Sequence, residues 1–166
     1  MIVLGIDPGT AITGYGVVRS DGRTSHLIEC GVLRTSARAP LAARLHDIFE
    51  GVAELIERHN PDALAVEDVF YARNVRTTVV LGHARGVVLL AGARAGVTIH
   101  EYAPALIKKT VVGRGAATKE QVQFMVARLL RLKSAPQPAD AADGVACALT
   151  CVMSAGAAVL RLRVAG

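Results

Sequence analysis

Four acidic residues stand at positions where a folded chain would gather them. Asp7 follows the largely apolar run 2–6, and Glu67 follows the apolar run 63–66. Asp140 and Asp143 are three residues apart, which places both on one face of a helix. Because sites in α/β sheets form at the carboxyl ends of strands, we expect Asp7 and Glu67 to meet at one sheet edge. A helix that begins at Asp140 would complete the group if its start packs at that edge.

A group of converging carboxylates is a candidate metal site. Such carboxylates repel one another unless a cation lies between them, and hard oxygen ligands favour Mg²⁺ or Mn²⁺. Two ions about 3.5–4 Å apart can activate a water, orient a phosphate and stabilise a leaving oxygen. Simpler interpretations remain open, since Asp140 suits a helix N-cap, Asp143 suits a first turn, and residues 7–10 could form a turn. No single acid by itself indicates a metal site. A purely structural role is hardest to assign to Glu67, because the residues before it are nearly all apolar.

Apolar periodicity and turn residues indicate the elements that position these acids. The first 33 residues predict three antiparallel strands, with Asp21-Gly22 in a hairpin turn. The spacing further along the chain predicts a helix at 40–60, a strand at 63–67, a helix at 74–95, a strand at 97–102, and helices at 103–112, from 118 and from 140. Thr118 and Gln121 form a capping-box pattern at the start of one of these helices. We therefore expect an α/β fold in which an antiparallel meander and parallel strands form one mixed sheet, with helices on both faces.

Composition limits the class of protein. The chain has 166 residues, of which 52% are hydrophobic and 20% charged, which indicates one folded domain and excludes a disordered chain. Its net charge of +5 favours polyanionic partners such as nucleic acid. Three cysteines without CxxC spacing argue against a disulfide framework and a zinc site. The start of the chain does not resemble a signal peptide, and we expect a cytoplasmic protein without a membrane partner.

Five motifs, taken in order, resemble the RuvC family of bacterial Holliday junction resolvases over roughly residues 1–155. They are Ile6-Asp7-Pro8-Gly9 with Thr13-Gly14-Tyr15-Gly16, Glu67-Asp68-Val69-Phe70, Gly82-His83-Ala84-Arg85-Gly86, Thr110-Val111-Val112-Gly113 and Asp140-Ala141-Ala142-Asp143. The resemblance implies a single RNase H-like domain over 1–166, with a short tail after the core. It also implies a homodimer that nicks four-way DNA junctions in pairs with two Mg²⁺ or Mn²⁺ ions per site. The RuvA–RuvB branch-migration complex is a further implied partner.

The resemblance assigns roles to particular residues of this chain. The implied catalytic residues and metal ligands are Asp7, Glu67, Asp140 and Asp143. Phe70 matches an aromatic that stacks on bases at the junction, and Lys108 and Lys119 match lysines near the DNA backbone. Tyr71, Arg73 and Arg76, which lie beside Phe70 in the sequence, are further candidate DNA contacts.

One residue departs from the family pattern, and three glycines in a predicted helix call for an explanation. Asp68 stands where a known family member has Gln, and strand alternation turns it away from Glu67, so we do not expect it to be a ligand. In the predicted helix at 74–95, Gly82, Gly86 and Gly92 each cost about 1 kcal/mol relative to Ala. We therefore expect close packing there, and we expect Gly82 and Gly86 to lie between the two copies of a dimer.

Two other functions remain possible. An actin-like ATPase or sugar kinase also has an Asp-x-Gly-Thr phosphate loop, which Asp7-Pro8-Gly9-Thr10 matches, but it needs a second domain for which 166 residues leave no room. A catalytically inactive junction-binding protein is the second alternative, and the presence of all four acids argues against it. ATP binding would favour the first, and DNA binding without cleavage would favour the second.

Overall fold

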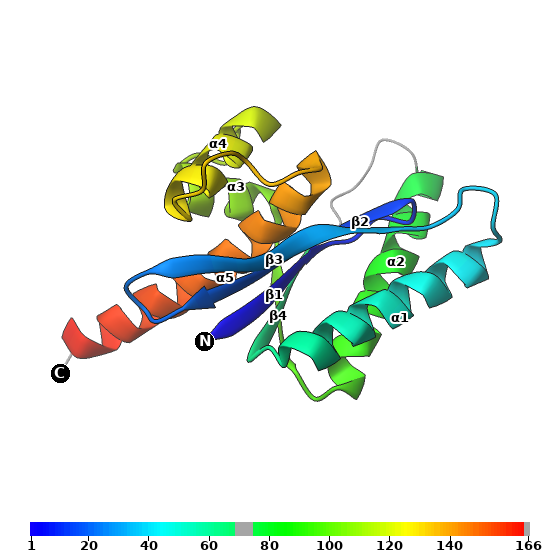
Figure 1. Cartoon of the computed structure of the whole chain (residues 1–166), viewed down its shortest axis with the longest axis horizontal. Coiled ribbons are helices and arrows are strands. Elements are labelled where there is room, and N and C mark those ends of the chain that lie inside the picture. The colour runs from blue at the N-terminus through cyan, green and yellow to red at the C-terminus, as the bar shows by residue number, and fades with distance from the viewer. Residues whose placement is uncertain (69–74, 165–166) are drawn as a thin grey trace.

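A mixed five-stranded sheet, in the order β3-β2-β1-β4-β5, forms the centre of the computed structural model, which describes residues 1–68 and 75–164 (Figure 1). The strands are β1 (Ile2–Asp7), β2 (Ile12–Ser20), β3 (Ser25–Arg34), β4 (Ala63–Glu67) and β5 (Thr98–Tyr102). β2 is antiparallel to both β1 and β3, whereas β4 runs parallel to both β1 and β5. The predicted combination of a meander with parallel strands is therefore confirmed.

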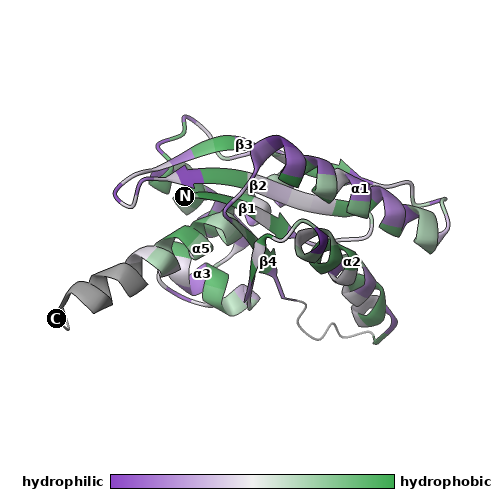
Figure 2. Cartoon of the chain, turned by 90° about the horizontal axis from the view of Figure 1, so that it is seen from below, coloured by the Kyte–Doolittle hydropathy of each residue, from purple (hydrophilic) through white to green (hydrophobic). Residues whose placement is uncertain are grey.

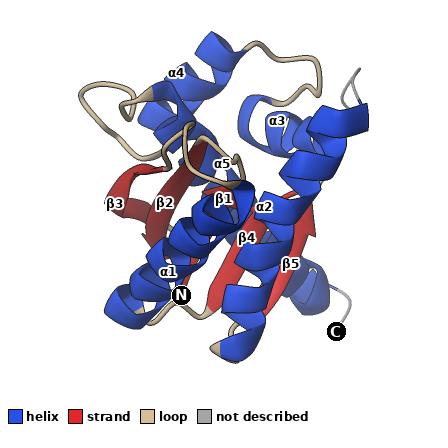
Figure 3. Ribbon diagram, turned by 90° about the vertical axis from the view of Figure 1, so that its right-hand side faces the viewer, coloured by secondary structure: helices blue, strands red, loops and turns tan. Residues whose placement is uncertain are grey.

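Helices cover both faces of the sheet, as the sequence predicted. They are α1 (Leu41–His59), α2 (Val75–Arg94), α3 (Pro104–Val112), α4 (Lys119–Leu129) and α5 (Ala139–Val164). One core lies between the sheet and α1 and α2, and a second lies between the sheet and α3, α4 and α5 (Figure 3). In Figure 2 the apolar residues of α5 lie next to the sheet, while much of the outer surface of α1 is polar.

The alternation of side chains along a strand determines which face of the sheet the last residues of β1 and β4 point to. In β1, Leu4 and Ile6 belong to the core beneath α1 and α2, whereas Val3 belongs to the core beneath α5. Asp7 shares the parity of Val3 and therefore faces the α5 side. The same alternation in β4 directs Glu67 to the α5 side. Both acids at the ends of neighbouring parallel strands thus face one helix.

Helix α5 approaches the sheet closely because glycines line the contact. These glycines are Gly5, Gly14, Gly16 and Gly144. A Cβ atom on Gly14 would overlap the carbonyl oxygen of Asp140, and one on Gly16 would lie 2.6 Å from the Cα of Val145. Any added side chain would push α5 outward, and the first turns of that helix carry two of the four candidate acids. The glycines therefore set the distance between α5 and the end of β1.

Two expectations about individual elements need correction. Helix α5 begins at Ala139, so Asp140 lies in its first turn instead of capping it. Gly92 packs tightly against Leu64, as expected, but a Cβ on Gly82 or Gly86 would meet nothing within 4 Å among the described residues. The reason is that Gly82 and Gly86 lie on the solvent-facing side of α2, so their expected close packing is wrong within this chain.

The structure also bears on membrane association. Among residues 1–68 and 75–164, no helix combines the length and the apolar character that crossing a bilayer requires.

Candidate active site

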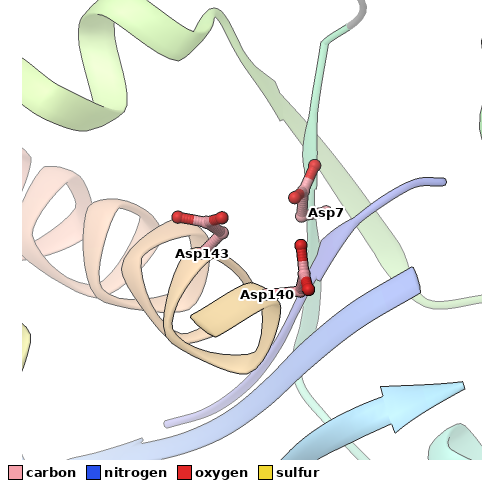
Figure 4. A group of neighbouring side chains, drawn as sticks. All are labelled: Asp7, Asp140 and Asp143. Carbon is pink, nitrogen blue, oxygen red and sulfur yellow. The ribbon is translucent and has the colours of Figure 1, made fainter. Parts of the chain in front are cut away.

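Three of the four candidate acids come together at the carboxyl end of β1. Asp7 ends that strand, and Asp140 and Asp143 project from the first turns of α5 toward it (Figure 4). Each offers a carboxylate oxygen, and these oxygens all lie within 4.8 Å of one another. All three residues are half-buried. Three oxygen donors at this spacing form a suitable ligand set for one divalent cation.

Glu67 lies beside this group and not within it. The parallel pairing of Ile6 with Val66 brings the end of β4 next to the end of β1. Glu67 lines the same pocket as Asp7 and Asp143, although it is outside the 4.8 Å cluster. Asp7 and Asp143 therefore belong to two overlapping sets of oxygen donors, one completed by Asp140 and the other by Glu67.

Two lysines line the same pocket as the acids. Lys119 donates to the Oδ2 oxygen of Asp143 at 2.8 Å, and Lys108 of α3 also lines the pocket. The predicted capping box is present, because the Thr118 hydroxyl accepts from the Gln121 N–H at 3.3 Å and Gln121 Oε1 accepts from the Thr118 N–H at 3.0 Å. This cap fixes the start of α4, so Lys119 is held toward the acids.

The acids shift each other's protonation. Burial and the charge of Asp143 raise the pKa of Asp7 to about 7, although Lys119 opposes this. Burial and the charges of Asp7 and Asp143 raise the pKa of Glu67 to about 8, against the opposing effect of Lys108 and Lys119. In the absence of a cation, part of this site therefore holds protons near neutral pH. A divalent cation would replace those protons and favour the ionised carboxylates.

A pH dependence of stability follows for the metal-free protein. Asp7 and Glu67 have a raised pKa in the folded state and a pKa of about 4 when unfolded, so the folded state binds more protons between these values. The free energy of unfolding should therefore fall as the pH rises from about 4 to about 8. Thermal denaturation in the presence of a chelator measures this fall.

Matched variants and added metal test the origin of that effect. Asp7→Asn and Glu67→Gln should each weaken the fall, whereas Asp47→Asn on the exposed surface of α1 should leave it unchanged. Added Mg²⁺ should restore more stability at pH 8 than at pH 5. A metal-free protein whose stability rises steadily over this range would contradict the assignment.

The predicted DNA-contacting residues are only partly placed. Lys108 and Lys119 lie at the pocket, and Arg76 is exposed in the first turn of α2. Phe70, Tyr71 and Arg73 fall outside the described residues.

Some residues that position the site were not predicted from the sequence. The glycines that allow the approach of α5 were not assigned this role, although glycines at alternate strand positions signal a nearby backbone; they are Gly5, Gly14, Gly16 and Gly144. No partner was predicted for Asp68, and the structure places Arg85 of α2 against it at 3.3 Å. Strand alternation had already indicated the face to which Asp68 turns.

Fold and site together define the class of this protein. A mixed sheet in this strand order, with acids at the ends of β1 and β4 and on a helix packed across them, is an RNase H-like domain with an acidic site.

Comparisons with known proteins then identify the family. The family described as "Crossover junction endodeoxyribonuclease RuvC" matches residues 3–151, and the chain belongs to this RuvC family. A relative of that name from Desulforamulus reducens is 48% identical over 149 residues, which is 90% of this chain and 91% of the relative. Another from Koribacter versatilis is 47% identical over 163 residues, covering 98% of both chains.

Solved structures agree with this assignment. The structure of Thermus thermophilus RuvC superposes with a TM-score of 0.86 at 39% identity, covering 93% of this chain and 95% of that one. The T. thermophilus RuvC structure in complex with Holliday junction substrate gives a TM-score of 0.85 at 37% identity, with the same coverage. These relatives leave the ATPase or sugar-kinase alternative without support.

Proposed function

We propose that this chain is a Holliday junction resolvase, a metal-dependent endodeoxyribonuclease that makes paired symmetric nicks in four-way DNA junctions during recombination and repair. The observation that carries the proposal is the convergence of Asp7, Asp140 and Asp143, with Glu67 and two lysines beside them, in a member of the RuvC family. The T. thermophilus relative has been solved with a Holliday junction, which supports the same substrate here. The cytoplasm, where bacterial DNA lies, is the proposed compartment.

The acids are proposed to hold two Mg²⁺ ions, with Mn²⁺ as a substitute. The residues fit such a pair, because Asp7 and Asp143 are shared by two overlapping sets of oxygen donors that Asp140 and Glu67 complete. When bound, the ions supply an activated water and stabilise charge on the phosphate. Asp7 and Asp143, which belong to both sets, would hold the ions together with Asp140 and Glu67.

The lysines and the residues before α2 are proposed to hold DNA. A cation between the acids would take over the neutralisation of Asp143, which frees the Lys119 ammonium to contact a phosphate. Lys108 lines the same pocket and is proposed to contact the backbone of the cut strand. Further proposed contacts are Phe70, Tyr71, Arg73 and Arg76, with the aromatic residues stacking on bases.

Salt dependence tests the lysines. Because each neutralised phosphate releases counterions, the logarithm of junction affinity should fall linearly with the logarithm of salt concentration. Lys108→Ala and Lys119→Ala should each reduce that slope by about one. Arg23→Ala, an exposed cation in the turn between β2 and β3, serves as the control and should not change it. An unchanged slope in both lysine variants would show that neither touches DNA.

A homodimer is the proposed working form, because a four-way junction has two-fold symmetry and one set of acids makes one cut. The exposed side of α2 offers a surface for it. Along this side Val75, Val79 and Leu90 are 79%, 53% and 52% exposed, and Gly82 and Gly86 leave the backbone uncovered by the described residues. These five residues recur every three or four positions, so they form one stripe. The RuvA–RuvB complex is proposed as a further partner.

A large side chain in the middle of this stripe should disrupt the dimer. Gly86→Leu is expected to weaken association by about 1–3 kcal/mol, the typical cost of overpacking, and to give monomers that nick poorly. Sedimentation velocity combined with a junction assay measures both effects. Ala43→Leu, which adds the same side chain on the exposed surface of α1, should remain dimeric. A wild-type monomer that resolves junctions at low concentration would overturn the dimer proposal.

The direct test of the function uses a synthetic four-way junction. Incubation with Mg²⁺ or Mn²⁺ should give two symmetric nicks, whereas a chelator should abolish nicking and a linear duplex of the same sequence should remain intact. Junction binding without any nicking would favour the inactive alternative. Neither binding nor nicking would reject the proposed function.

A further inference from the structure

The guanidinium group of Arg85, in α2, forms ion pairs with acids at the ends of two neighbouring strands, β4 and β5. Its terminal nitrogen pairs with Asp68 at 3.3 Å and also with Glu101 of β5. Both acids lie on the α2 side of the sheet. Glu101 is paired with Val66, whose side chain belongs to the core beneath α1 and α2, and Asp68 follows Val66 by two residues and therefore turns to the same side. Arg85 therefore acts on the face opposite the metal site.

The strand ends that Arg85 holds are those that carry Glu67. Glu67 is the last residue of β4 and is paired with Tyr102, the last residue of β5. The backbone N–H of Asp68 then donates to the Tyr102 carbonyl at 2.9 Å, after which the chain leaves the sheet. The end of β4 is thus held on one side by β1, through the pairing of Ile6 with Val66, and on the other side by this short pairing with β5, an edge strand. The ion pairs of Arg85 reinforce the pairing at its final residues.

The guanidinium is held in place chiefly by charge. Its side chain is 25% exposed, whereas those of Asp68 and Glu101 are 51% and 43% exposed, so solvent screens the two ion pairs in part. Its Nε is buried and has no hydrogen-bond partner among the described residues. The two carboxylates are thus the groups that keep Arg85 at the strand ends.

We propose that Arg85, through Asp68 and Glu101, is a positioning residue that holds Glu67 in register with Asp7. Loss of Arg85 leaves two carboxylates close together on one face, and their repulsion separates the ends of β4 and β5. Glu67, on the opposite face of the same backbone, then moves away from Asp7. The proposal rests on the proposed function only in treating Glu67 as a metal ligand.

The first test is Mn²⁺ binding to the protein alone, measured by calorimetry with Arg85→Met. The dissociation constant for Mn²⁺ should rise about tenfold, in the range observed when partners of metal ligands are removed. Junction affinity measured without metal should stay at the wild-type value, while junction cleavage falls. Arg94→Met is the matched control on α2, where Arg94 lies over the ring of Phe49, and it should change none of these quantities.

Removal of the repulsion provides the decisive second test. Adding Asp68→Asn to Arg85→Met should restore much of the Mn²⁺ affinity, which a loss of side-chain packing alone would not allow. If Arg85→Met does not fold, Arg85→Gln removes the same positive charge, leaves both carboxylates in place and should also weaken Mn²⁺ binding. Unchanged Mn²⁺ affinity, failure of the restoring substitution, or a loss confined to junction binding would each overturn the proposal. A wild-type protein that binds Mn²⁺ but cuts no junction would instead reject the proposed function.

Discussion

Asp7→Asn is expected to reduce junction cleavage by about 10³-fold or more while junction binding persists. Asp7, like Asp143, belongs to both sets of oxygen donors, so its neutralisation weakens both. Losing even one group that stabilises charge in a reaction commonly costs about 10²–10³-fold in rate. The amide is isosteric with the carboxylate and removes a negative charge, so DNA should bind at least as well.

The corresponding substitution at the other three acids, together with a control on the protein surface, extends this test. Glu67→Gln, Asp140→Asn and Asp143→Asn should each give the same separation of binding from cleavage, measured by gel shift and by single-turnover nicking. Asp47→Asn, which also removes one carboxylate, should cleave normally because it lies on the exposed surface of α1. Normal cleavage by Asp7→Asn would show that the acidic cluster is not the catalytic site.

Gly14→Ala is expected to damage both the fold and the site, although it adds only one methyl group. That methyl group would overlap the carbonyl oxygen of Asp140, a backbone atom that cannot rotate away. Overpacking of this kind costs about 1–3 kcal/mol in stability. Because α5 must shift outward, Asp140 and Asp143 move from Asp7, and a misplacement of about 1 Å can lower a rate about 10²-fold.

The matched control for this variant lies in α5 itself. A Cβ on Gly156 would meet nothing within 4 Å in the part of the chain that the structure describes, so Gly156→Ala should cleave normally. It should also gain up to about 1 kcal/mol, since Ala favours a helix over Gly. Thermal denaturation and nicking at a temperature well below the transition distinguish lost stability from a displaced site. Gly14→Ala with wild-type stability and cleavage would refute the role assigned to the glycine contact.

Much of the fold was predictable because the local signals were strong and agreed with one another. The strand 63–67 was predicted with its observed bounds, since an apolar run ends there in two acids. The capping box at Thr118 was also predicted, because it depends only on residues three apart. The meeting of Asp7 with the acids of α5 required one further assumption, that the start of this helix packs at the carboxyl end of the first strand.

Contacts between separate helices and strands could not be predicted from local sequence patterns. Gly82 and Gly92 are both glycines within one predicted helix, yet Gly82 faces solvent and Gly92 packs on Leu64. Which glycine is buried depends on the rotation of the helix about its axis, which the local sequence does not give. Asp140 was read as a possible cap, whereas the helix begins one residue earlier. The pairing of Asp68 with Arg85 joins residues on separate elements, so periodicity could not reveal it.

The two sides of α2 have a consequence for the timing of the reaction. On one side, Gly82 and Gly86 face solvent. On the other side, Arg85 forms ion pairs with the acids at the ends of β4 and β5, next to Glu67. In the proposed dimer joined through the first side, a tilt of the paired helices would reach the ends of β4 and β5 in both copies. If that dimer cuts a junction twice, α2 would couple the timing of the two incisions. One helix would then connect the proposed partner surface with the strand end that carries Glu67.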